Sequence, residues 1–156
     1  MRKLQETPPS IASDGKFSLG VFKSPFRNLN MLDVDPFGGG AVPRALRALR
    51  LKDWQHYAVI HPDFYFGTVI FHAGFTAKTF FFAYDRRSKK LLEHRLMLAP
   101  WQAEVAESLF GGRSRARHIG YKLDYENRID EGRHEIRADI ASSRAAHAMT
   151  ASVRVL

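Results

Sequence analysis

Residues 50–84 read RLKDWQHYAVIHPDFYFGTVIFHAGFTAKTFFFAY. The stretch holds three aromatic-rich segments in a row, of the kind that favours β-strands, and the sequence Leu-Lys-Asp-Trp at 51–54 introduces them. Within residues 64–75, apolar side chains occur in both phases of a two-residue alternation. The pattern therefore predicts neighbouring antiparallel strands that are buried on both faces.

The same alternation continues toward the C-terminus. A polar turn at 85–90 leads to a strand at 91–98, and residues 102–110 fit either a helical turn or a short strand. Gly111–Gly112 is expected to end that element. The later predicted strands are 116–125, with Ile119 in phase with Tyr121, then 130–141 and 147–156.

Regularly spaced strands without long helices favour an all-β, mainly antiparallel fold. The strand number fits a lipocalin-like β-barrel, which has room for one small ligand, or half of a double barrel. We expect a flexible N-terminus at 1–15 and a single barrel-like domain at 16–156.

One short helix is expected near 44–52, where RALRALRLK places Leu46 and Leu49 on one side to pack on the core. The glycines at 38–40 lack the Gly-Lys-Ser/Thr of a phosphate-binding loop, so they indicate a connector and no nucleotide site.

Composition limits the class of protein. A chain of 156 residues with 45% hydrophobic residues suits one globular domain. It has no cysteine, which excludes disulfides and thiolate chemistry and favours a cytoplasmic location. No apolar run approaches the roughly 18 residues that span a bilayer, so we expect a soluble protein without a transmembrane segment. No cofactor is indicated, and the oligomeric state is left open.

The formal net charge is +8, which makes an acidic partner conceivable. The basic residues concentrate in expected turns: Arg86, Arg87, Lys89, Lys90, Arg113, Arg115 and Arg117. Solvated turns are the favoured interpretation, ahead of weak contact with an anionic surface. Nucleic-acid binding is disfavoured, because the aromatic residues are more numerous and more apolar than a base-stacking platform needs.

The segment RLKDWQHY at 50–57, with the aromatic strands after it and Gly20, Pro25, Asn28 and Asn30 before it, resembles the family called domain of unknown function 2804. The resemblance covers roughly residues 16–125. Family members are about twice this length and are similar to proteins made of two lipocalin-like halves, the architecture of carotenoid hydratases. The resemblance implies that this chain is the N-terminal half of a longer protein, and it brings no established catalytic residue.

Histidine is the one versatile catalytic residue present in quantity, and the seven histidines form no HExxH or HxH metal pair. His72, His94 and His134 share a phase with apolar neighbours. If those faces line one cavity, the imidazoles there can orient or protonate an apolar ligand. Hydrogen-bonded structural histidines are the simpler alternative. Asp53 fits a structural ion pair better than a catalytic carboxylate, and no serine has a GxSxG context.

These patterns favour a pocket for a hydrophobic or lipid-like small molecule. An enzyme of the hydratase, isomerase or cyclase type acting on an apolar substrate is the first alternative, and a basic module for nucleic acid or anionic membrane is the second. A plain hydrophobic core would give the same apolar pattern. The candidate ligand-binding residues are Phe64, Phe66, His72, Phe80, Phe82, His94, Trp54 and Tyr57, and no catalytic or metal-binding residue is nominated.

Overall fold

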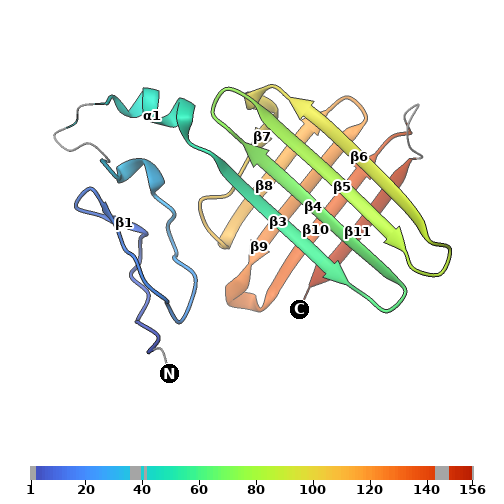
Figure 1. Cartoon of the computed structure of the whole chain (residues 1–156), viewed down its shortest axis with the longest axis horizontal. Coiled ribbons are helices and arrows are strands. Elements are labelled where there is room, and N and C mark those ends of the chain that lie inside the picture. Colours follow the sequence, from blue (N-terminus) through green and yellow to red (C-terminus); the bar gives the residue numbers. More distant parts are fainter. Residues whose placement is uncertain (1–2, 36–39, 41, 143–147, 156) are drawn as a thin grey trace.

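The computed structural model describes residues 3–35, 40, 42–142 and 148–155, and antiparallel strands in two facing layers make up most of it (Figure 1). The first layer is a four-stranded sheet of β3 (Asp53–Ile60), β4 (Phe64–His72), β5 (Ala77–Asp85) and β6 (Lys90–Leu98), in that order. The second layer has the order β11 (Met149–Val155), β10 (Arg133–Ile140), β9 (Tyr121–Arg128), β8 (Phe110–His118) and β7 (Ala103–Glu104). The all-β, antiparallel fold expected from the sequence is confirmed.

Short helical turns join these elements. The 3-10 turn η2 (Pro100–Gln102) takes the chain from β6 in the first layer to β7 in the second, and η3 (Ile129–Glu131) joins β9 to β10. The α-helix α1 (Arg44–Arg50) confirms the predicted helix. Its leucines do not pack in the core, because α1 lies against the N-terminal segment, where the Arg47 guanidinium donates 2.7 Å to the Leu32 carbonyl.

The N-terminal segment forms a small layer of its own beside the sheets, with β1 (Ala12–Ser13), β2 (Lys16–Phe17) and the 3-10 turn η1 (Met31–Asp33). The amide of Leu29 donates 2.9 Å to the carbonyl of Glu107, which ties the segment to the loop before β8. The predicted division into 1–15 and 16–156 stays a prediction. Gly38 and Gly39 of the predicted connector lie outside the described residues.

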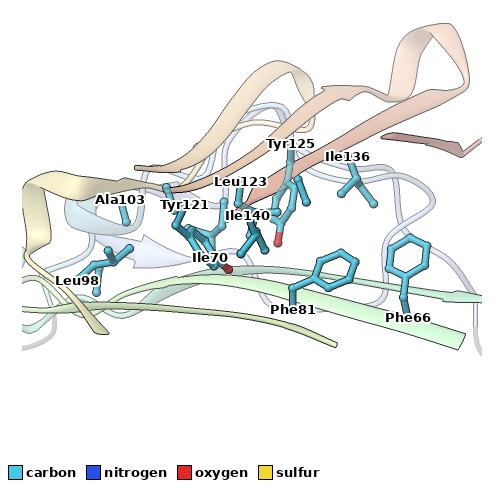
Figure 2. Packing of buried hydrophobic residues seen from close by; sticks show 13 residues of the cluster. Phe66, Ile70, Phe81, Leu98, Ala103, Tyr121, Leu123, Tyr125, Ile136 and Ile140 are labelled. Carbon is cyan, nitrogen blue, oxygen red and sulfur yellow. The ribbon is translucent and has the colours of Figure 1, made fainter. Parts of the chain in front are cut away.

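The core fills the space between the layers, where the two sets of strands cross at a large angle (Figures 1 and 2). Phe66 and Phe81 rise from the first layer, and Tyr125 and Ile136 reach toward them from the second (Figure 2). Among the described strands, β3, β6, β7 and β11 lie at sheet edges. Closure into a lipocalin-like barrel is therefore not confirmed.

The segment predicted as one strand at 116–125 is instead the hairpin of β8 and β9. Gly120 has a φ of 69° and supplies the tight turn, so Ile119 is 95% exposed and does not share the face of Tyr121. Gly111 was expected to end an element. Instead it has a φ of 78° and lies where the register shifts between Phe110 and Arg113. The bulge lets β8 continue through the glycines.

Every second side chain of β4 and β5, including those of Tyr65, Phe80 and Phe82, faces away from the other sheet. Rings of Tyr65 and Phe82 lie 5.3 Å apart, and those of Phe80 and Phe82 lie 6.1 Å apart. These three aromatic side chains are half-buried because they pack on one another. The other layer covers only the inner face of this sheet. The sequence prediction of burial on both faces is therefore wrong for this sheet.

Candidate functional site

An apolar cleft opens between the two layers, where β5 and β6 face β11. Its volume is about 690 Å³, and alternate residues of the strands supply most of its wall. The apolar lining residues are Phe64, Phe66, Phe81, Ala83, Leu91, Leu92, Met149, Ala151 and Val153. Because β6 and β11 are both sheet edges, side chains from the two layers meet there, and none of the described strands closes the gap.

The structure divides the eight candidate ligand-binding residues between the two faces of the first sheet. Phe64, Phe66, Tyr57, His72 and His94 occupy inner positions, as the register of the four strands requires. Only Phe64 and Phe66 of these line the apolar cleft.

The other three candidates lie on the outer face. Trp54 is 64% exposed, and Phe80 and Phe82 stack on each other. No single site therefore collects all eight, because strand alternation sends neighbouring residues to opposite sides.

A polar network crosses the sandwich close to the core. The Gln55 amide nitrogen donates 2.6 Å to Oδ1 of Asn127 and 2.8 Å to the Tyr57 hydroxyl. The Tyr57 hydroxyl in turn donates 2.6 Å to the same Asn127 oxygen and lies 2.9 Å from Nδ1 of His134. The Ser114 hydroxyl donates 2.5 Å to the Gln55 carbonyl oxygen. The network therefore joins β3 to β8, β9 and β10.

Proton positions in the network follow from its geometry. The single Tyr57 proton goes to Asn127, so the contact with His134 requires a proton on Nδ1 of the imidazole. Burial lowers the pKa of His134, which favours the neutral ring. Burial also raises the pKa of Tyr57 to about 12. His134 thus behaves as a hydrogen-bonded structural histidine at neutral pH.

Sequence reasoning missed Gln55, Ser114 and Asn127. For Asn127 the sequence did contain a signal. It lies two residues after Tyr125 and four after Leu123, on the side of the strand whose residues are buried. A polar residue in an apolar phase needs an internal hydrogen-bond partner.

The Leu-Lys-Asp-Trp sequence at 51–54 lines a second cavity, of about 650 Å³, between β3, the N-terminal segment and residues 105–109. Burial raises the pKa of Asp53, nearby Glu107 raises it further, and the charge of His72 opposes both. His72 pairs with Asp53 across β3 and β4. The structural ion pair expected for Asp53 is not among the ion pairs of the described residues, and the alternative of a helix-end contact stays a prediction.

The arginines of β8 have acidic neighbours. Arg115 contacts Glu104 at 2.7 Å, and Arg117 forms an ion pair with Asp124. Arg113 lies 3.4 Å from Glu126. Three of the seven basic residues expected in turns therefore lie on a strand, each beside a carboxylate.

The described residues hold no cluster of three or more His, Cys, Asp or Glu side chains placed to bind a metal ion. No helix among them is both long and apolar enough to cross a membrane. His147 lies outside the described part of the chain.

The fold and the cleft define a two-layer antiparallel β protein with an open apolar gap between its sheets. The chain belongs to the family described as Domain of unknown function (DUF2804), whose model matches residues 2–155. The match is wider than the expected 16–125 and includes the C-terminal third. Comparison with curated proteins and with solved structures gave no match.

Proposed function

We propose that this protein binds a hydrophobic small molecule in the cleft between β5, β6 and β11. The observation that carries the proposal is the apolar lining of a space of about 690 Å³. Sites for small ligands span roughly 300–1,000 Å³ and are mostly apolar. Removing a ligand's apolar surface from water there contributes about 25 cal/mol per Å².

The other two functions gain less support from the described contacts. An enzyme needs polar groups converging on its substrate, and the predicted His72 and His94 do not line the apolar cleft. A nucleic-acid or membrane surface needs free cations, whereas Arg115 and Arg117 meet carboxylates. Both functions remain alternatives.

Displacement of N-phenyl-1-naphthylamine, an uncharged apolar fluorophore, tests the proposal together with native mass spectrometry of the purified protein. Ala151→Phe places a ring in the cleft from β11, and we expect it to weaken fluorophore binding at least tenfold. Ala58→Phe adds the same ring on the exposed outer face of β3 and serves as the matched control.

Two results contradict the proposal. One is an absence of fluorophore binding to the wild-type protein. The other is unchanged binding by Ala151→Phe together with weakened binding by Phe82→Ala, which would place the fluorophore on the outer aromatic face.

A further inference from the structure

A smaller cavity, of about 230 Å³, adjoins the apolar cleft along β6. Leu92 and His94 are consecutive inner residues of β6, about 6–7 Å apart; Leu92 lines the cleft and His94 lines the smaller cavity. Ile140 of the smaller cavity pairs directly with Met149 of the cleft. The two spaces therefore follow one another along the same open side of the sandwich.

Polar atoms without a hydrogen-bond partner are buried beside this cavity. His94 is only 7% exposed, and its Nε2 has no hydrogen-bond partner among the described residues. The same holds for the hydroxyl of Tyr121, which also lines the cavity, and for the hydroxyl of fully buried Thr79. Burial raises the pKa of Tyr121; Thr79 lies close enough to lower it in part, although the two hydroxyls lack full hydrogen-bond geometry.

Buried polar atoms without a partner are unusual, and Nε2 of His94 is the clearest of the three. Thr79 and His94 are diagonal neighbours on the inner face, because Thr79 pairs with Leu96 and His94 with Phe81. Leaving a buried donor or acceptor unpaired destabilises the fold, because the group has lost its hydrogen bonds to water. A group that hydrogen-bonds to these atoms would recover much of that stability.

The unpaired groups also indicate the chemistry of the partner. Imidazole, phenol and alcohol groups can each donate and accept hydrogen bonds. Glu93 and Arg95, which also line the cavity, form an ion pair with each other, so their charges are balanced. Burying an ion without a counter-charge is far more costly than burying a hydroxyl or carbonyl group.

We propose that the ligand of the cleft is an amphipathic alcohol, aldehyde or ketone. Its apolar body lies in the cleft against Leu92 and Met149, and its uncharged oxygen binds His94 in the smaller cavity. This inference rests on the proposed function and adds the class of ligand. The polar end fits a cavity smaller than the usual site for a whole ligand, which suits one terminal group.

A series of compounds with equal chain length tests the inference by competition with N-phenyl-1-naphthylamine: decane, 1-decanol, 2-decanone and decanoate. We expect the alcohol and ketone to bind roughly fivefold to tenfold more tightly than decane, since one net hydrogen bond contributes about 1 kcal/mol. His94→Leu should remove this preference and leave decane binding unchanged. His56→Leu, an exposed histidine on the outer face of β3, should keep it.

A second readout covers the case in which His94→Leu fails to fold. In the wild-type protein, ¹⁵N spectra of the imidazoles should show 1-decanol shifting the His94 signal and decane leaving it in place. Equal affinity for decane and 1-decanol overturns the ligand class and leaves the apolar cleft as a binding site. Preferred binding of decanoate overturns the uncharged head group. Failure of both decane and 1-decanol to bind overturns the proposed function as well.

Discussion

The Tyr57 hydroxyl lies 2.9 Å from Nδ1 of His134, a residue 77 positions further along the chain. Tyr57 belongs to the first sheet and His134 to the second, so the contact joins the two layers. Their rings are also close, with centroids 5.5 Å apart. Together with the bonds of Gln55 to Asn127 and Ser114, the pair ties the two layers to each other through polar contacts.

Tyr57→Phe should destabilise the protein by about 1–3 kcal/mol, because it leaves Asn127 and His134 without one hydrogen-bond partner each. Urea unfolding followed by circular dichroism measures the loss. Tyr65→Phe removes a hydroxyl from the outer face, keeps the ring beside Phe82, and should change stability little. Equal effects of the two variants would contradict the structural role of the network.

The lowered pKa of His134 predicts that the protein becomes less stable as the pH is lowered. Because the folded pKa lies below 6.5, the unfolded chain binds the proton first, and protonation favours unfolding. The contribution is fully present above pH 6.5 and decreases as the pH falls toward the folded pKa. Urea midpoints at about pH 8 and about pH 5.5 should converge in His134→Gln but not in His56→Gln. A wild-type midpoint that is constant across this interval would refute the prediction.

Gly67→Ala should destabilise the first sheet by about 1–3 kcal/mol, as overpacking does. A Cβ at residue 67 would lie 2.5 Å from two atoms of the Phe82 ring, which covers this glycine. In the double variant Gly67→Ala, Phe82→Ala the added methyl has room, so the double loss should be smaller than the sum of the single losses. Simple additivity in thermal unfolding would mean that the ring can move aside without cost.

Gly120→Val should be less stable than Gly120→Asn by roughly 1 kcal/mol. The φ of 69° is tolerated by asparagine and strongly disfavoured for a β-branched residue. Both variants add the same Cβ near Ala141, so their difference reports the backbone conformation. Chemical denaturation of the two proteins side by side gives the comparison, and equal stabilities would count against the tight turn.

Local sequence patterns predicted the strands between residues 53 and 98 well, because apolar alternation and the polar turn at 85–90 are local signals. The hairpin at Gly120 was missed because a glycine within an alternating run looks the same whether the chain turns or continues. The division into two open sheets depends on pairing between distant strands, which alternation does not specify.

The candidate site was only partly predictable for the same reason. The aromatic content of β4 and β5 pointed to an apolar wall, and Phe64 and Phe66 do line the cleft. Its opposite wall comes from Met149, Ala151 and Val153, more than sixty residues away in the sequence. Trp54 and Phe82 were grouped with the inner residues because aromatic character does not reveal which face a side chain takes.

The two walls of the cleft differ in how firmly hydrogen bonds to neighbouring strands hold them. β5 lies inside its sheet between two partners, whereas β11 pairs with β10 alone among the described strands. Edge strands open locally at lower free energy than central ones, and a molecule bound across the gap adds contacts only while β11 is in place. Occupancy of the cleft is thereby coupled to amide hydrogen exchange: the backbone of residues 149–155 should exchange more slowly with ligand bound, while central β5 changes little.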